Sequence, residues 1–283
     1  MRETSRRLPR RCIVGLLMQS PILDDKRHDE PSAFTPENLL REARRQKGLP
    51  VSKVPRVCVL DPDADILRDV VATGRARRDP AWACYHTELH VVGEEDASFG
   101  LVGGVIGASF AVLVAEELFA SGCEVLLSIT SAGQITPVGA PPYFILIDRA
   151  IRDEGTSYHY LPPARYAEAD PILLDAAARA LAANGLVVER GSTWTTDAPF
   201  RETAATIASR RDEGVLAVEM EAAALYAFAN ARGKQVLCFA HVTNQMALTD
   251  GDFEKGEANG ARDALRLIDA LVGVIDRLSP PLT

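Results

Sequence analysis

Residues 215–244 read VLAVEMEAAALYAFANARGKQVLCFAHVTN, and this stretch decides the fold class. Its first four residues are apolar and predict a short strand. The alanine-rich run 221–231 predicts a helix that Gly233 ends. Residues 235–242 are apolar again, with β-branched and aromatic side chains, as is typical of a buried parallel strand. The stretch therefore predicts a strand–helix–strand unit of an α/β protein.

Polar side chains follow both predicted strands of this unit. Glu219 and Glu221 come after the first strand, and Thr243 and Asn244 come after the second. A right-handed parallel unit brings the carboxyl ends of its strands to one edge of the sheet, where open α/β sheets bind their ligands. The sequence therefore predicts a crevice in which two carboxylates and an amide converge.

The composition argues against several classes of protein. The 283 residues carry a net charge of −8, which argues against a nucleic-acid partner or an anionic membrane surface. No apolar run approaches the ~20 residues of a membrane span. Five scattered cysteines without a Cys-x-x-Cys pair predict buried, reduced thiols in a cytosolic protein. Without repeats or long linkers, a chain of this length is predicted to form a single domain.

The first strand is predicted at 12–18. Arginines precede this run as in a signal peptide, but no cleavage-site pattern follows before Pro21, so we interpret the run as a strand. Further predicted strands are 56–60, 99–105, 124–129, 143–148 and 186–193, with a looser strand-like run at 82–92. Predicted helices are 36–46, 65–73, 110–120, 171–184, 204–211 and 257–278, and a loop is predicted at 157–166.

Two motifs suggest a metal or a cofactor but fit neither. The acidic turn 61–65 (Asp-Pro-Asp-Ala-Asp) lacks the glycine and the glutamate of a calcium loop, so we interpret it as a turn that begins a helix. Gly103, Gly104 and Gly107 have the spacing GGxxG rather than GxGxxG, and no acid stands at the end of the next strand. No metal and no organic cofactor are therefore predicted.

Four motifs together resemble one enzyme family. Residues 218–224 (VEMEAAA) match its most specific motif, V-E-M-E-x-A-A. Residues 104–109 (GVIGAS) are similar to its G-M-G-x-P-S turn, 130–133 (TSAG) to its G-[ST]-x-G strand end, and 196–200 (TDAPF) to its S-S-D-x-F-Y segment. The family is that of the nucleoside phosphorylases and nucleosidases, the group of uridine phosphorylase, hexameric purine nucleoside phosphorylase and methylthioadenosine nucleosidase.

The order and spacing of the motifs agree with the family over most of the chain. We therefore predict a divergent N-terminal segment, 1–50, packed on a phosphorylase-like domain, 51–283. The resemblance implies a single α/β domain with a mixed, largely parallel and partly closed sheet flanked by helices. It also implies a cytosolic homo-oligomer with its sites at subunit interfaces, which cleaves the N-glycosidic bond of a nucleoside.

The resemblance implies roles for single residues as well. Glu221 would accept hydrogen bonds from the 2′- and 3′-hydroxyls of ribose, and Met220 would pack beneath the sugar. Asn244 would meet the N7 side of a purine. Phe200 or a neighbour would cover the base, and Pro199 stands where the family usually has its aromatic residue. Glu221 and Asn244 are the predicted catalytic residues.

The other predicted substrate-binding residues surround these side chains. Gly104 and Ser131 would line the site of an anion or of a water molecule. The remaining ones are Glu219, Thr243, Thr130 and Gly133. The residue types suit the reaction, because cleavage passes through an oxocarbenium-like sugar that a carboxylate stabilises, while the leaving base needs a proton or a hydrogen bond.

Two departures from the family pattern concern the nucleophile and the leaving group. The phosphorylases carry one arginine in the turn that reads LDPDAD at 60–65, and another at the position of Ser128. Loss of both favours water, unless Arg201, Arg210 or an arginine of a partner subunit supplies the charge. The nucleosidases use an aspartic acid where this chain has Asn244, an amide that can hydrogen-bond a 6-oxopurine or a pyrimidine but cannot donate a full proton.

Three functions therefore remain open. The resemblance to the family favours phosphorolysis of a 6-oxopurine or pyrimidine nucleoside. Phosphate would be the co-substrate, and free base and sugar 1-phosphate would be the products. Hydrolysis by a nucleosidase is the second. A nucleoside-binding protein without catalytic activity is the third.

Overall fold

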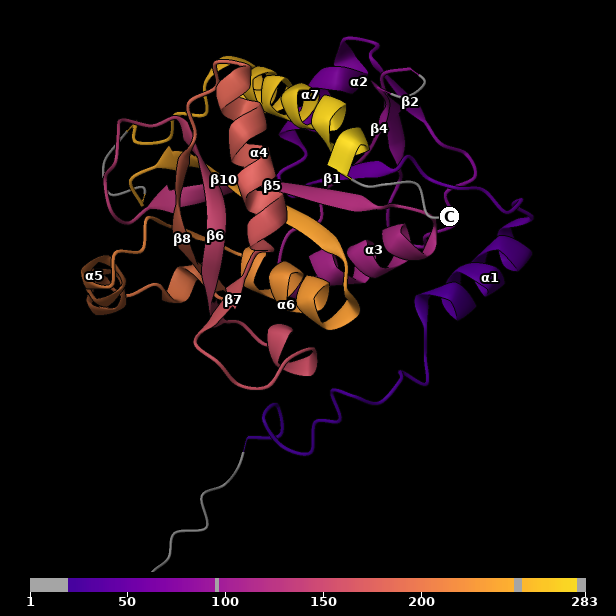
Figure 1. The fold of residues 1–283 in the computed structure, drawn as a ribbon, viewed down its shortest axis with the longest axis horizontal. Coiled ribbons are helices and arrows are strands. Elements are labelled where there is room, and N and C mark those ends of the chain that lie inside the picture. Colours follow the sequence, from indigo (N-terminus) through magenta and orange to yellow (C-terminus); the bar gives the residue numbers. More distant parts are fainter. Residues whose placement is uncertain (1–19, 95–96, 247–250, 279–283) are drawn as a thin grey trace, which may run out of the picture.

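The computed structural model describes residues 20–94, 97–246 and 251–278 (Figure 1). Its strands are β1 (Val57–Asp61), β2 (Ala76–Arg78), β3 (His90–Val92), β4 (Phe99–Gly103), β5 (Val125–Gln134), β6 (Tyr143–Asp153), β7 (Tyr166–Glu168), β8 (Glu189–Thr196), β9 (Ala217–Glu219) and β10 (Gln235–Asn244). Its helices are α1 (Pro36–Lys47), α2 (Asp65–Ala72), α3 (Ala108–Ala120), α4 (Pro171–Ala183), α5 (Ala204–Asp212), α6 (Ala222–Arg232) and α7 (Ala261–Leu278). The short 3-10 helices are η2 (Ser157–His159), η3 (Pro199–Arg201) and η4 (Glu257–Gly260).

The strands form one mixed sheet, half of which closes into a ring. The order is β10-β6-β8-β9-β5-β1-β4-β3-β2, with β7 beside β6 and an additional pairing of β10 with β5. The strands β5, β10, β6, β8 and β9 thereby surround a common interior, while β1, β4, β3 and β2 continue from β5 as an open sheet. Closure leaves fewer unpaired strand edges. The prediction of a single α/β domain with a mixed, partly closed sheet is confirmed.

The strand–helix–strand unit at 215–244 has the predicted elements but not the predicted direction. β10 runs parallel to β5, whereas β9 pairs with β5 antiparallel. The cause is the ring, in which β9 joins the parallel pair β6 and β8, and β6 runs antiparallel to β10. The prediction of a parallel unit with both strand ends at one edge is therefore wrong.

Helices cover both sides of the sheet (Figure 1). α4 and α7 pack together on one side with α2 beside them, and α3 and α6 pack together on the other. α6 is buried from Ala222 to Ala229, because it contacts β6, β7, β8 and β10 as well as α3. A helix that is apolar all round is expected in such an interior position. One large hydrophobic core joins these helices to the sheet.

Capping residues set the ends of two predicted helices where the sequence placed them. Thr35 accepts a hydrogen bond from the backbone N–H of Asn38 and begins α1. Gly48 ends the same helix, and Gly233 ends α6, both with left-handed backbone. These boundaries follow from local chemistry, so the sequence was sufficient to predict them.

The strand-like run 82–92 is mostly a loop, and only its end forms β3. The carbonyls of Ala83 and Cys84 bind the ammonium group of Lys47, at 3.0 and 2.6 Å, rather than a neighbouring strand. The prediction of a strand over the whole run is therefore wrong, because a side chain of α1 takes the backbone acceptors that a strand partner would need.

Other predicted boundaries also shift. The strand expected at 186–193 is β8, which begins later and continues to Thr196, because its last residues pair with the end of β6. The loop expected at 157–166 contains η2 and the first residue of β7. The strand expected at 12–18 lies outside the described residues.

The chain before β1 contacts the rest of the molecule at separate points. Leu40 and Ala43 of α1 are buried against Ala83. Further upstream, the ring Nε2 of His28 lies 3.1 Å from the carbonyl oxygen of Tyr158. A division of the chain at residue 50 remains a prediction.

Tyr226 of α6 tests the packing between this helix and the ring. Its buried hydroxyl donates to the carbonyl of Ile147 in β6 (2.6 Å) and accepts from the backbone N–H of Cys238 in β10 (3.0 Å). Replacement by phenylalanine leaves both backbone groups buried without a partner. We therefore expect Tyr226→Phe to lower the free energy of unfolding by about 1–3 kcal/mol, measured by urea denaturation.

The matched control for this variant is Tyr85→Phe. The Tyr85 hydroxyl donates to Gln46 on the exposed surface (2.8 Å), so its loss should change the free energy of unfolding by no more than about 0.5 kcal/mol. Equal losses in the two variants would contradict the structural task assigned to Tyr226.

Candidate active site

Glu221 is the residue at which the segments of the site meet. It stands immediately before α6, and only 1% of its surface is exposed. Its Oε1 accepts a hydrogen bond from the backbone N–H of Gly107, in the turn between β4 and α3 (2.6 Å). Its Oε2 accepts one from the hydroxyl of Thr130 in β5 (2.8 Å). Two elements that are distant in the sequence therefore orient this carboxylate.

The turn between β4 and α3 depends on two glycines. Gly104 and Gly107 have φ values of 79° and 92°, in the left-handed region that residues with a Cβ rarely adopt. The N–H of Gly104 donates to the carbonyl of Asp61 at the end of β1 (3.0 Å), and the N–H of Gly107 reaches Glu221. The two glycines thus allow the backbone N–H groups of this turn to reach Asp61 and Glu221.

Glu219, at the end of β9, binds only protein groups. Its Oε2 accepts from the backbone N–H groups of Glu221 and Ala222, at 2.7 Å each, and so caps the first turn of α6. Its Oε1 accepts from the hydroxyls of Thr193 and Thr195 in β8, at 3.0 and 2.5 Å. These four hydrogen bonds indicate that Glu219 holds α6 and β8 together. A contact of Glu219 with substrate remains a prediction.

Burial changes the acidity of both glutamates. The pKa of Glu221 is raised to about 7, chiefly by burial and next by the charge of Glu219, although the hydrogen bonds from Gly107 and Thr130 favour the ionised form. Burial also raises the pKa of Glu219. The Glu221 carboxyl group therefore changes its charge near neutral pH.

Asn244 lies at the end of β10, beside Gly133 of β5. Its Oδ1 accepts from the backbone N–H of Met246 (2.9 Å), and its Nδ2 donates to the hydroxyl of the fully buried Thr243 (3.2 Å). These bonds orient the amide and use one of its two hydrogens. A Cβ at Gly133 would lie 2.6 Å from the sulfur of Met246 and 3.3 Å from Val218, so the absence of a side chain lets these residues pack closely against β5.

The strand β5 brings the two predicted catalytic residues to one region. Gly133 pairs with Asn244 on one side and with Val218 of β9 on the other. Because β9 runs antiparallel to β5, the residues after β9 return along β5 as far as Thr130, which binds Glu221. The segments that carry the two residues thus lie along the same part of β5, but by an antiparallel pairing rather than by the predicted parallel unit.

The remaining predicted residues differ in exposure. Met220 and Ser131 are half-buried. Phe200, in η3, is 100% exposed, so its ring could cover a ligand only from the solvent side. Arg201 follows it in η3 and is exposed as well. The roles predicted for Met220, Ser131 and Phe200 remain predictions.

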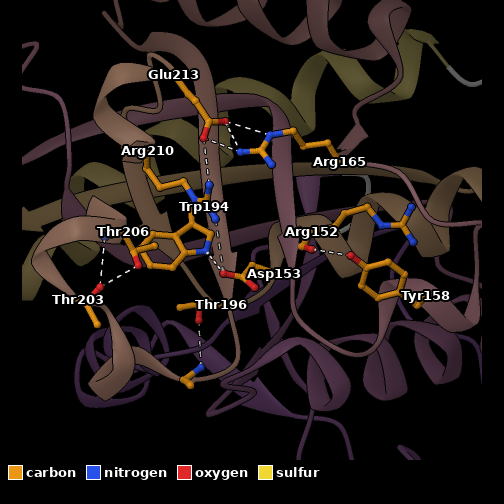
Figure 2. A network of polar contacts seen from close by, with 11 residues as sticks. Arg152, Asp153, Tyr158, Arg165, Trp194, Thr196, Thr203, Thr206, Arg210 and Glu213 are labelled. Carbon is orange, nitrogen blue, oxygen red and sulfur yellow. Dashed lines mark hydrogen bonds and ion pairs between the residues drawn. The ribbon is translucent and has the colours of Figure 1, made fainter. Parts of the chain in front are cut away.

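A polar network holds the strand end that precedes η3 against α5 (Figure 2). The indole N–H of Trp194 donates to Asp153 at the end of β6 (2.9 Å). Arg210 of α5 lies over the indole ring and forms ion pairs with Asp153 (3.8 Å) and Glu213 (3.0 Å). Two carboxylates therefore already compensate Arg210, which weakens its candidacy as the missing phosphate ligand.

The turn after β1 is an acidic corner, formed by Asp61, Asp63 and Asp65. Lys255, from the loop after β10, donates to Asp63 (3.0 Å) and to Asp65 (2.7 Å). Asp61 is 2% exposed, and its pKa is raised to about 7 by burial and by the two neighbouring aspartates. Sequence reasoning missed Lys255, since no local pattern connects a lysine in a polar loop with a turn 190 positions earlier.

The acidic corner borders a small cavity of about 20 Å³. Its lining includes Asp61 together with Thr130 and Ser131. This volume has room for about one water molecule, and the carboxylates and hydroxyls provide the polar partners that a buried water needs. Ser128, at the position of the second family arginine, is buried in β5, and its hydroxyl has no partner among the described residues.

The described ranges contain no helix that is long and apolar enough to span a membrane. In the same part of the chain, no three or more histidine, cysteine or acidic side chains are grouped so that they could hold a metal ion. The cysteines within it, Cys58, Cys84, Cys123 and Cys238, are free and buried. Cys12 lies outside the described residues.

The chain matches a family model described as Phosphorylase superfamily over residues 68–273. No curated protein sequence is similar enough to count as a relative.

Solved structures share the fold. Uridine phosphorylase from Vibrio fischeri ES114 is 21% identical, with a TM-score of 0.65 over 79% of this chain and 92% of that chain. AMP nucleosidase from Bacteroides thetaiotaomicron is 19% identical, with a TM-score of 0.65 over 80% and 92%. Purine nucleoside phosphorylase from Toxoplasma gondii, in complex with immucillin-H, is 15% identical, with a TM-score of 0.67 over 80% and 92%. At such identities the likeness establishes the fold alone.

The raised pKa of Glu221 makes the stability of the protein depend on pH. The folded state holds this proton up to about pH 7, whereas an ordinary glutamate loses it near 4.5, so the native state binds more protons between these values. The contribution of Glu221 to stability is therefore complete below pH 4.5 and is lost as the pH rises to 7. We expect the wild type to lose on the order of 3 kcal/mol relative to Glu221→Gln across this window, measured by urea denaturation.

Glu213→Gln is the control for this measurement. The pKa of Glu213 is lowered, chiefly by its hydrogen bond with Arg165, so its contribution has the opposite sign and is lost as the pH falls. Parallel pH–stability curves for the wild type and Glu221→Gln would contradict the raised pKa of Glu221.

Proposed function

The chain belongs to the phosphorylase superfamily, and we propose that it hydrolyses the N-glycosidic bond of a nucleoside to free base and free sugar. In this reaction the oxygen of water bonds to C1′ of the sugar as the bond from C1′ to the base nitrogen breaks. The bonding electrons leave with the base, which takes up one proton in exchange for the one that water loses. The main support for water rather than phosphate as the nucleophile is the acidic corner.

The acidic corner offers no favourable place for an anion. Three aspartates surround it, and its lysine, Lys255, already pairs with Asp63 and Asp65. Ala64 and Ser128 stand where the phosphorylases that the sequence resembles carry their arginines. The adjoining cavity has room for about one water, so water fits there better than a phosphate ion.

Asp61 supports activation of that water. It lines the cavity, and its pKa of about 7 leaves much of it ionised at neutral pH, where it can accept a proton. Thr130 lines the same cavity and donates to Glu221, so the water lies next to the predicted ligand of the sugar. The nucleophile and the sugar would then both bind beside the end of β5.

Glu221 would hold and stabilise the sugar. Its Oε1 accepts a hydrogen bond from Gly107 and its Oε2 accepts from Thr130 and Met220, and a carboxylate has a further lone pair for a hydroxyl of ribose. In its ionised form Glu221 places a negative charge beside the ring, which favours the oxocarbenium-like transition state over the neutral substrate.

Asn244 would meet the leaving base with the hydrogen of its amide that is not bonded to Thr243. An amide stabilises developing negative charge by a hydrogen bond but does not transfer a proton. This favours bases that carry such charge well, a 6-oxopurine or a pyrimidine. The proton that the base finally takes up would then come from water.

Two other functions remain candidates. Phosphorolysis is supported by Lys255, which brings a cation to the acidic corner. Nucleoside binding without catalysis is supported by Asn244, which supplies no acidic proton to the leaving base.

We also propose a cytosolic homo-oligomer with sites at subunit interfaces, supported by the exposed apolar side chains Ile106, Leu113 and Phe200.

Base release from a panel of purine and pyrimidine nucleosides distinguishes these functions. We expect chromatography to find equal release of free base with and without inorganic phosphate, and free sugar as the second product. Release that requires phosphate and yields a sugar 1-phosphate would establish phosphorolysis instead. Tight nucleoside binding without base release would indicate a nucleoside-binding protein without catalytic activity.

Glu221→Gln tests the contact with the sugar. We expect kcat/KM for a ribonucleoside to fall by about 10²-fold, because the carboxylate acts mainly in the transition state. With the matching 2′-deoxynucleoside the loss should be much smaller, since one of the two hydroxyls that Glu221 would bind is absent. Glu213→Gln, on the surface, should leave both rates near those of the wild type, and equal losses on the two substrates would contradict the assigned contact.

A further inference from the structure

Lys255 joins two loops that are distant in the sequence. Its Nζ donates to Oδ2 of Asp63 (3.0 Å) and to Oδ2 of Asp65 (2.7 Å). Asp65 also accepts from Arg68 (2.5 Å) and from the amide of Asn259 (3.4 Å). The Lys255 side chain is 24% exposed and that of Asp65 only 10%, so solvent screens this ion pair less than one on the open surface.

The charges of this cluster compensate one another. Burial raises the pKa of Asp65, but hydrogen bonds from Lys255 and Arg68 outweigh that effect and leave the pKa below its ordinary value. Burial lowers the pKa of Lys255, but Asp65 and Asp63 outweigh that effect and raise it. Both partners therefore stay ionised around neutral pH. An incoming anion would meet a lysine whose charge two carboxylates already balance.

The cluster also limits the room at the acidic corner. Asp63, Asp65 and Asn259 line the cavity of about 20 Å³ together with Thr130 and Ser131. One water molecule fills such a volume. A phosphate ion has five heavy atoms and could enter only if side chains of this cluster moved away.

The loop that carries Lys255 continues directly from the end of β10. The backbone N–H of Glu254 donates to the carbonyl of Thr243 (2.7 Å), and the N–H of Gln245 donates to Asp252 (2.9 Å). The loop is thus anchored on β10 beside Asn244, and Lys255 ties it to the acidic corner. The ion pair connects the region of the leaving base with that of the nucleophile.

We propose that the cluster of Lys255, Asp63 and Asp65 determines which nucleophile enters the site, with Lys255 as a latent phosphate ligand that the two aspartates neutralise. The proposal rests on the proposed hydrolysis and deepens it, because it names the residues that exclude phosphate. Removal of both carboxylates frees the ammonium group and makes room beside it. An ammonium group is an effective point-charge ligand for phosphate.

Asp63→Ser combined with Asp65→Ser is the test variant, because serine is small, polar and tolerated at the start of α2. The first measurement is calorimetric titration of the nucleoside-free protein with inorganic phosphate. We expect at least tenfold tighter binding by the double variant than by the wild type. Lys255→Met, added to the double variant, should abolish this gain.

The second measurement uses a nucleoside that the wild type cleaves. We expect base release by the double variant to rise with phosphate concentration and part of the sugar to appear as sugar 1-phosphate. Asp175→Ser is the matched control, because it breaks the exposed ion pair with Arg190 away from the acidic corner. It should leave both measurements at their wild-type values.

A folded double variant that binds phosphate no better than the wild type overturns the proposal, and so does a gain that persists after Lys255→Met. If circular dichroism shows that the double variant does not fold, Asp63→Asn combined with Asp65→Asn carries the same test, because the amides remove both negative charges and keep the size of the side chains. Absence of cleavage by the wild type would refute the proposed hydrolysis only, and phosphate binding would still decide the role of the cluster.

Discussion

The hydrogen bonds that hold the buried carboxylate of Glu221 are the constraint on which the site depends. A carboxylate in the interior is costly unless donors surround it, and here the backbone N–H groups of Gly107 and Met220 and the hydroxyl of Thr130 do so. Two of these donors come from the turn after β4 and from β5, so these elements must keep their places relative to α6. The left-handed glycine in that turn is one consequence, because its N–H must point at the carboxylate.

The closed half of the sheet provides this arrangement. β9 is a short strand inserted between β5 and β8, and it delivers Glu219 to two threonines of β8 and to the first turn of α6. Glu219 therefore anchors the start of the helix whose preceding residue, Glu221, faces β5. The two acids have different roles because Glu219 is the last residue of β9, whereas Glu221 already stands at the start of α6. Burial, and next the charge of Glu219, raises the pKa of Glu221.

At the acidic corner the chain differs from the phosphorylase pattern in two ways, by lost arginines and by additional aspartates. Loss of the family arginines and gain of aspartates would leave an uncompensated negative charge in a partly buried turn. Lys255 from the loop after β10 compensates it together with Arg68, and the ion pairs of Lys255 anchor that loop beside Asn244. The same cluster thus compensates the charge of the turn and holds the loop beside Asn244.

The sequence alone determined the features that rest on local chemistry. It was sufficient for the α/β class, for most helix boundaries through caps such as Thr35 and Gly233, and for the V-E-M-E-x-A-A motif that identifies the superfamily. It did not predict the direction of β9, the capping by Glu219, or the pairing of Lys255 with Asp63 and Asp65. Those features depend on which segments lie side by side once the ring closes. Only the tertiary structure decided them, because hydrophobic periodicity and helix capping report on neighbours in the chain, whereas strand direction and ion pairing depend on neighbours in space.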